Sequence, residues 1–370
     1  MKPRNTGLLL LGLAALIVLA FTQLRGHGGK PGAGPRDAAS GNAGQAQTIV
    51  KLRVGGEKIG FLEDPEVKDF LARRYGLAVD YQKAGSVAMV EGKTDGLDAL
   101  WPSSQVTLQL YRNRHGGSAV AETIFNSPVV LYSTKEVTGA LQRLGIVRVE
   151  QGTYYIVDMP RLIDLMVKQA HWKDLGLPQL NGRVTVFSTD PNQSNSGMMF
   201  SGLLANLLNG GDVVDETRIS PLLPRLKKFF SVQGFMPTSS DDIFRNFLNV
   251  GDQPIIVGYE SQLVEVCLTQ PQLVPQLKDS IRTLYPRPTV WTQHPLIVLT
   301  PKGKQLLQAL RDPELQQKAW RRHGFRSGST SVVNDPAELQ VTGVPAKVRN
   351  TMQMPNAVVM EKVLQALQPR

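Results

Sequence analysis

Residues 48–104 alternate between strand-like and helix-like patterns, and this alternation limits the fold more than any other feature of the chain. The first helix pattern begins at Asp64-Pro65-Glu66, which combines a capping residue, a proline at the first helical position and an acid in the first turn, and it stops at Gly76. A strand–helix–strand rhythm is typical of a parallel sheet with helices on its faces. The sequence therefore predicts an α/β fold. Strands are expected at 48–54, 77–81 and 97–101, and a second helix at 87–91.

Each predicted strand of this segment ends in small polar residues. In an open parallel sheet, ligands bind just beyond the carboxyl ends of the strands. Three such loops therefore indicate one crevice, although small polar residues are also the normal content of turns that join a strand to a helix. The loops are Gly55-Gly56-Glu57-Lys58, Gly85-Ser86 and Pro102-Ser103-Ser104.

Two long apolar strands, predicted at 124–132 and 290–299, divide the chain. A second set of helix and strand patterns lies between them and includes predicted strands at 182–187 and 254–259. Two crossings between two α/β halves describe a clamp of two lobes, each a mainly parallel sheet flanked by helices. The first lobe is expected at 48–126 and 297–370, and the second at 130–290.

The stretch from Phe187 to Gly197 is a polar loop that joins a predicted strand to a predicted helix. Behind it, apolar pairs between Met199 and Leu208 recur every four residues, as on the buried face of a helix. The first turn of a helix has unpaired N–H groups and a partial positive charge, which suit an anionic or carbonyl ligand. Ser194, Asn195 and Ser196 also fit a plain helix cap, so the loop is either a cap or part of a ligand site.

The N-terminus has the pattern of an export segment, because Lys2 and Arg4 precede an apolar run at 7–21. We expect residues 1–25 to be a signal peptide or an N-terminal membrane anchor, and the length of the apolar run leaves both open. Residues 26–47 are rich in Gly, Ala, Ser, Asn and Gln and are expected to be a flexible linker or a disordered mature N-terminus. The rest of the protein is therefore expected in the cell envelope, outside the cytoplasmic membrane.

Charge and motif content count against several functions. The net charge is +10, but no run of Lys or Arg is longer than two residues, so nucleic-acid binding is not supported. The 5 histidines have no metal-ligand spacing, and no catalytic, phosphate-loop or dinucleotide motif occurs, so neither a metal, a cofactor nor an enzyme activity is predicted. The single cysteine, Cys267, lies in an apolar run and is expected to be buried.

Short motifs recur in a characteristic order along 48–326. They are Gly-Gly-Glu-Lys at 55–58, Gly-Ser at 85–86, Ala-Leu-Trp-Pro-Ser-Ser at 99–104, Ser-Pro-Val-Val-Leu at 127–131, Ser-Thr-Asp-Pro-x-x-Ser-Asn-Ser-Gly at 188–197, Gly-Tyr-Glu-Ser-Gln at 258–262, His-Pro at 294–295 and Gly-Phe-Arg at 324–326. In this order the chain resembles bacterial extracytoplasmic solute-binding proteins, the binding components of ABC importers. The resemblance is to the type II periplasmic-binding fold, nearest its phosphate- and other anion-binding branches.

The resemblance implies a small solute, with an anion as one candidate, that is held between the lobes and delivered to an ABC permease or another membrane partner. Hydroxyl groups and helix N-termini would hold the ligand, and Lys58 would add a charge. Glu260 and Asp190 would repel a dianion if they faced the cleft. The residues that the resemblance places at the ligand are Lys58, Ser86, Ser103, Ser127, Ser194, Asn195, Ser196, Tyr259 and Glu260.

Two other functions remain open at this point. The first is a membrane-tethered sensor or signalling module with the same fold, which a long linker after an uncleaved anchor favours. The second is an enzyme, since the fold also hosts transferases, although the sequence contains no recognisable nucleophile–base pair. For solute capture, the sequence also predicts that Ser196→Trp abolishes ligand binding and leaves the melting of the fold largely unchanged.

Overall fold

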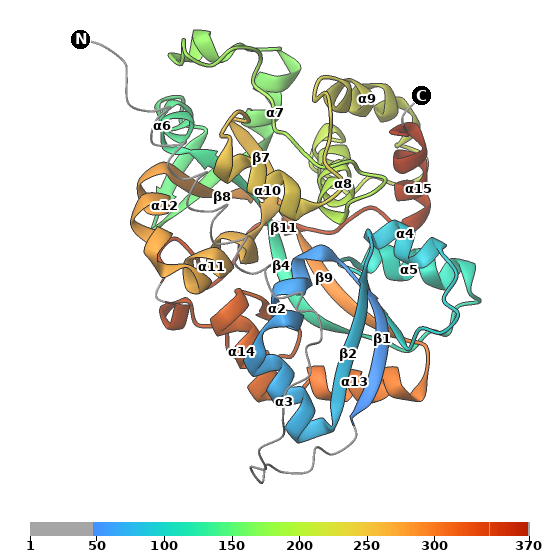
Figure 1. Ribbon diagram of the computed structural model, residues 1–370. Helices are drawn as coiled ribbons and strands as arrows, with labels where there is room; N and C mark the ends of the chain where they lie inside the picture. Colours follow the sequence, from blue (N-terminus) through green and yellow to red (C-terminus); the bar gives the residue numbers. More distant parts are fainter. Residues whose placement is uncertain (1–46, 340, 369–370) are drawn as a thin grey trace, which may run out of the picture.

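The computed structural model describes residues 47–339 and 341–368 and shows two lobes joined by two long strands (Figure 1). The strands are β4 (Ala121–Thr134) and β9 (Thr289–Val298), which pair antiparallel with each other. The predicted signal peptide or anchor, and all but the last residue of the predicted linker, lie outside the described residues. No helix in the described part of the chain is long and apolar enough to cross a membrane.

Lobe 1 is built on β1 (Thr48–Val54), which lies between β2 (Leu77–Lys83) and β3 (Ala99–Trp101) in a parallel arrangement. The predicted parallel sheet is therefore confirmed in this lobe. β3 in turn pairs antiparallel with β9, which ties the sheet to the crossing strands. The carboxyl ends of β1, β2 and β3 thus meet at one edge of the sheet.

The helices of lobe 1 begin and end at the residues that the sequence marks. α3 (Pro65–Tyr75) begins where the Asp64 side chain accepts a hydrogen bond from the Glu66 backbone N–H, and it ends at Gly76, whose φ is 62°. This left-handed conformation suits glycine, which has no Cβ to clash. The other helices of the lobe are α2 (Ile59–Glu63), α4 (Ser86–Glu91), α5 (Gln105–Arg114), α13 (Pro301–Leu310) and α14 (Pro313–His323).

Lobe 2 contains a more antiparallel sheet than predicted. β7 (Ile255–Tyr259) and β8 (Ile281–Arg287) both pair antiparallel with β4, and β5 (Val147–Glu150) pairs antiparallel with β6 (Tyr154–Asp158). Within the described residues of this lobe, β6 and β8 form the parallel pair of strands. The difference arises because β4 runs as one long strand into both lobes, and its neighbours return along it in the opposite direction. The helices that flank this sheet include α6 (Lys135–Arg143), α7 (Met159–Val167), α9 (Leu223–Ser231), α10 (Ser240–Asn249), α11 (Glu260–Thr269) and α12 (Val274–Ser280).

The strand predicted at 182–187 is wrong. This segment forms isolated bridges, which join His171 to Arg183 and Phe187 to Ile256. Its alternating apolar residues are nevertheless buried, with Val184 and Val186 in the core. The apolar residues of this segment therefore correctly indicated buried side chains. Its backbone, however, reaches β7 mainly at Phe187.

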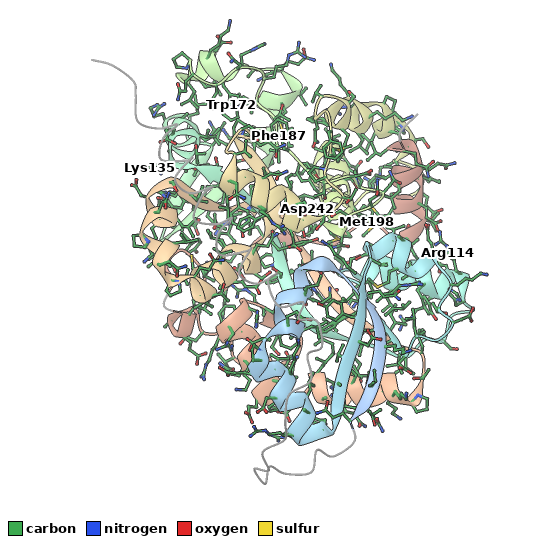
Figure 2. All side chains as sticks on the ribbon, viewed as in Figure 1. Arg114, Lys135, Trp172, Phe187, Met198 and Asp242 are labelled. Carbon is green, nitrogen blue, oxygen red and sulfur yellow. The ribbon has the colours of Figure 1, made fainter. Side chains whose placement is uncertain are left out.

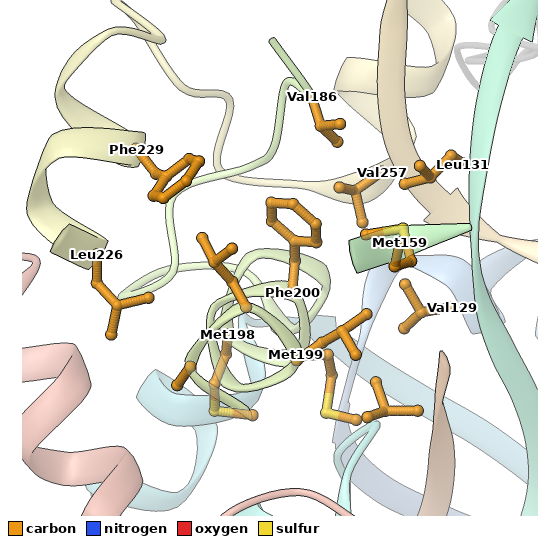
Figure 3. Packing of buried hydrophobic residues seen from close by; sticks show 14 of the residues in the cluster. Val129, Leu131, Met159, Val186, Met198, Met199, Phe200, Leu226, Phe229 and Val257 are labelled. Atoms are coloured by element: carbon orange, nitrogen blue, oxygen red, sulfur yellow. The ribbon is translucent and has the colours of Figure 1, made fainter. Parts of the chain in front are cut away.

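The helix behind this segment, α8 (Asn195–Leu208), is buried nearly all around from Asn195 to Asn206. Figure 3 shows Phe200 of this helix pointing toward Val186 and Val257, and Figure 2 places Met198 near the level where the two lobes meet. Such close packing fixes the axis of α8 and therefore the position of its N-terminus.

The C-terminal segment contacts both lobes, although the predicted boundaries assign it to the first lobe alone. β11 (Thr351–Met352) pairs with the start of β9, and the Asn206 side chain donates a hydrogen bond to the Gln353 carbonyl. α15 (Ala357–Ala366) then packs on α5 of lobe 1 and on α8 and α9 of lobe 2 (Figure 1). Its buried Met360 and Val363 belong to the same apolar cluster as residues of both lobes. This helix therefore adds an apolar contact between the lobes, apart from the crossing strands.

Candidate functional site

A small polar pocket lies between the lobes. Lobe 1 contributes loop residues 55–57 and 83–86, and lobe 2 contributes 193–195, 238–240 and Tyr259. The free volume of the pocket is about 30 Å³, whereas one water needs roughly 10–15 Å³. The lobes are thus closed against each other in this structure, with room for about two waters between them.

The local folds that bring these residues together are strand ends and helix starts. In lobe 1, residues 55–57 follow β1 and residues 83–86 follow β2, so both loops lie at the carboxyl edge of the parallel sheet. In lobe 2, the first turns of α8 and α10 point toward the pocket, with Ser194 and Ser239 as their N-caps. Two of the three loops that the sequence predicts around one crevice, 55–58 and 85–86, therefore contribute to the pocket, whereas residues 102–104 do not line it; helix N-termini of lobe 2 form the opposite wall.

A buried charged network lies at the lobe 1 wall of the pocket, which its member Glu57 lines. The Lys58 Nζ atom is 2.5 Å from Glu57 Oε1, 2.8 Å from Ser103 Oγ and 3.4 Å from His294 Nδ1. Burial opposes ionisation of Glu57, but Lys58 and His294 outweigh it and lower the pKa of Glu57 to about 2. Burial, with Lys58 beside it, lowers the pKa of His294 to about 3, so the neutral imidazole can accept from Lys58. Glu57 is therefore an anion, and the three N–H groups of Lys58 have partners inside the protein.

Asn195 connects the two lobes and keeps one polar atom unused. Its Nδ2 atom donates to the Ser103 backbone carbonyl of lobe 1 and to the Tyr259 hydroxyl, both at 3.0 Å. A carbonyl oxygen can only accept, so the amide nitrogen must face Ser103 and the orientation of the amide is fixed. The Asn195 Oδ1 atom is buried and has no hydrogen-bond partner within the described part of the protein. A buried, unpaired oxygen costs free energy, which a ligand that donates to it would recover.

A second carboxylate approaches the pocket from lobe 2. Asp241, in the first turn of α10, lies 4.0 Å from Lys83 Nζ of lobe 1. A Cβ atom on Gly56 would lie 2.9 Å from Asp241 Oδ2, so the missing side chain of this glycine makes room for the carboxylate. Burial, together with the negative charge of Glu57, raises the pKa of Asp241 to about 6. Two carboxylates from opposite lobes therefore share this region.

Replacing Asp241 by Asn is expected to raise the free energy of unfolding at pH 7 by about 1–2 kcal/mol. The folded-state pKa of Asp241, about 6, exceeds its value in an unfolded chain, so the folded state binds the proton more tightly. The ionised carboxylate therefore destabilises the fold, fully above pH 6, and this penalty shrinks as the pH falls from about 6 toward 3.8, the ordinary pKa of an aspartate. Urea unfolding of both proteins at pH 7 and pH 4.5 measures the effect, with Asp242→Asn as the control. Equal stabilities of Asp241→Asn and the wild type at pH 7 would contradict it.

The nine residues predicted for the ligand are only partly brought together. Ser86, Ser194, Asn195 and Tyr259 line the pocket, and Ser103 lies directly behind Asn195. The remaining residues lie outside the pocket lining. These are Lys58, Ser127, Ser196 and Glu260.

Glu260 and Ser196 bind other side chains of the protein and are not exposed in the pocket. The Glu260 carboxylate accepts hydrogen bonds from Arg326 at 2.6 and 2.9 Å and from the Tyr285 hydroxyl at 2.8 Å. Ser196 is fully buried, and its hydroxyl lies 2.7 Å from that of Thr189. A tryptophan at position 196 has no space, so the prediction that Ser196→Trp leaves melting unchanged is wrong.

The sequence-based set omitted the lining residues Glu57, Lys83 and Gln193 and the cluster Thr238-Ser239-Ser240. The cluster has the same pattern as Ser194-Asn195-Ser196, namely small polar residues before a helix, and this signal was available in the sequence. Among the described residues, no group of three or more His, Cys, Asp and Glu side chains is placed to hold a metal ion. Cys267 is buried, as predicted.

Solved structures with similar folds share little sequence with this chain. A periplasmic thiamin-binding protein matches with a TM-score of 0.59 at 13% identity, over 91% of this chain and 98% of its own. The substrate-binding protein of an ABC transporter from Agrobacterium tumefaciens matches with a TM-score of 0.57 at 13% identity, over 87% and 95% of the two chains. A two-component system protein that mediates signal transduction matches with a TM-score of 0.53 at 12% identity, over 87% and 100%. No protein-family model and no curated protein matches the sequence.

These similarities establish the fold. The chain has the two-lobed α/β architecture of type II periplasmic-binding proteins, as the order of its motifs predicted. The similar structures include a thiamin-binding protein, so they do not single out the anion-binding branches of the fold.

Proposed function

We propose that the protein is an extracytoplasmic solute-binding protein, which captures a small polar molecule between its lobes and passes it to an ABC-type membrane transporter. The observation that carries the proposal is the pocket between the lobes, to which both lobes contribute and in which Asn195 Oδ1 is buried without a partner. Similar structures that bind thiamin or transporter substrates support the same reading. The chemistry is binding alone, with no bond made or broken.

Closure of the lobes would couple binding to transport. β4 and β9 join the lobes and are the natural hinge for the motion. A ligand that contacts residues of both walls binds the closed form more tightly than the open form, and this difference shifts the population toward closure. The closed form would then be the one that a membrane partner recognises. Residues 7–21 would direct the protein across the membrane or anchor it there.

A membrane-tethered sensor is the second candidate function. It is favoured by the similarity to a two-component signalling protein. A sensor would use the same pocket, and its partner would be a signalling protein instead of a permease. The two functions differ in the partner, which crosslinking of the ligand-loaded protein in its native membrane would identify.

Thermal melting of the full-length protein against a panel of oxyanions, amines, amino acids, sugars and short peptides tests the proposal. A ligand that binds only the native state raises the melting temperature by mass action, and at a hundredfold excess over Kd it contributes about 2.7 kcal/mol. We expect one chemical class to raise the melting temperature. If no compound of any class changes it, solute capture is contradicted.

A further inference from the structure

We infer that the pocket selects a small organic ligand with a primary ammonium group, held by Glu57 of lobe 1 and Asn195 of lobe 2. The gap of about 30 Å³ takes the ammonium group, and the lobes part further to admit the rest of the ligand. The inference rests on the proposed function and names the class of solute. It departs from the anion that the sequence resemblance suggested, and it follows from which atoms of the pocket still have free hydrogen-bonding capacity.

The positive charge that an anion would need is not available on the inner wall. Lys58 is fully buried, and Glu57, Ser103 and His294 lie within hydrogen-bonding distance of its Nζ atom. The other cation of the pocket, Lys83, is 44% exposed and lies at the rim, where it is 3.2 Å from the Ser239 hydroxyl. An anion in the pocket would therefore be repelled by the Glu57 carboxylate, while the cation that lines the pocket, Lys83, is largely exposed to solvent.

Two acceptor oxygens of pocket-lining residues, one from each lobe, have no hydrogen-bond partner among the described residues. Lys58 and Ser103 both donate to Glu57 Oε1, and no hydrogen bond from a described residue reaches Glu57 Oε2. Asn195 Oδ1 is an amide oxygen, which can only accept, and the two hydrogens of the Nδ2 atom are already used. An ammonium group carries three donors and a positive charge, so it matches a carboxylate and an amide oxygen from opposite lobes.

Asp241 supplies a second reason for a cation. Its carboxylate belongs to lobe 2, and the negative charge of Glu57 from lobe 1 raises its pKa. The two carboxylates therefore repel each other when the lobes close. A cation between the lobes would turn this repulsion into attraction toward both walls. Other charged groups act on Asp241 as well: Lys83 and Arg245 favour its ionisation, and Glu265 opposes it.

Two matched series of probes separate charge from size. The two-carbon series is ethanolamine, ethylene glycol and glycolate, and the four-carbon series is putrescine, 1,4-butanediol and succinate. We expect the amine of at least one series to bind the full-length protein in calorimetric titration, with an affinity at least tenfold higher than that of the alcohol or acid. If the acid binds best, the ammonium assignment is overturned and solute capture stands. If other compounds of the panel bind and neither amine does, the ammonium assignment is again overturned and solute capture stands. If nothing binds, both the ammonium assignment and solute capture are contradicted.

Variants of neighbouring carboxylates locate the charge. Asp241→Asn keeps the shape of the side chain and is expected to lower the affinity for the amine about threefold to tenfold. Asp242→Asn makes the same chemical change one residue further along α10 and is expected to leave the affinity unchanged. Neither residue lines the pocket, but it is Asp241 that faces Lys83 of lobe 1 across it, at 4.0 Å. The amine affinity of the wild type should also fall between pH 7 and pH 5, and Asp241→Asn should reduce that dependence. Equal effects of the two variants on amine affinity would overturn the placement of the ammonium group.

Discussion

Gly85→Ala is expected to hold the two lobes apart and to lower the affinity for ligand at least tenfold. A Cβ atom on Gly85 would lie 1.9 Å from the backbone carbonyl oxygen of Gln193 in the opposite lobe. A backbone oxygen cannot rotate away as the end of a side chain can, so the lobes themselves must separate. The φ and ψ angles of Gly85 are −64° and 146°, which alanine adopts without strain. The substitution therefore acts on closure and leaves each lobe intact.

Small-angle X-ray scattering and calorimetric titration measure this effect. The variant should have a larger radius of gyration than the wild type and a much lower ligand affinity. Gly139→Ala is the matched control, because a Cβ atom there has 3.9 Å of space to the nearest group, the Arg143 guanidinium, and lies on α6 away from the pocket. Wild-type affinity and compactness in Gly85→Ala would show that the walls of the pocket do not meet as described.

Arg326→Met is expected to lower the free energy of unfolding by about 3–5 kcal/mol. The Arg326 guanidinium binds both oxygens of Glu260 and also donates to the Pro345 and Ala346 carbonyls. Removing it leaves the Glu260 carboxylate, which is 1% exposed, without its countercharge. A buried carboxylate without a partner is strongly unfavourable, whereas removal of both charges together costs much less.

Urea unfolding of three variants tests this account of the ion pair. The double variant Glu260→Gln/Arg326→Met should recover much of the stability that Arg326→Met loses. Arg321→Met, which breaks an exposed ion pair with Glu338 on the surface of α14, should change stability by about 0–1 kcal/mol. A loss in Arg326→Met as small as the loss in Arg321→Met would refute the structural role of the buried pair.

The sequence predicts local structure well where the signal is itself local. Asp64, Pro65 and Gly76 set the ends of α3 through hydrogen bonds and backbone conformations within a few residues, and the structure confirms them. The two crossing strands were also predictable, because their long apolar runs reflect burial on both faces. The strand at 182–187 failed because a run of buried residues does not require a paired backbone.

The site was predictable in place but not in detail. Small polar residues at strand and helix ends indicated several of the loops that line the pocket, including those with Ser86 and Asn195, but also residues 102–104, which do not line it. Which carboxylate is free depends on tertiary pairing: Glu260 is neutralised by Arg326, 66 residues away, whereas Glu57 keeps one oxygen without a partner among the described residues. The local sequence shows Lys58 beside Glu57 but gives no sign of the pairing of Glu260 with Arg326, so the set of ligand-facing charges required the three-dimensional structure.

Backbone hydrogen exchange, measured with and without a saturating concentration of the tightest-binding probe, tests the central claim most directly. The pocket joins residues 83–86 of lobe 1 to residues 193–195 of lobe 2. The account predicts that ligand slows exchange in peptides from both segments at once, because closure buries them together. Protection in one lobe alone, or at a surface away from both segments, would contradict binding between the lobes.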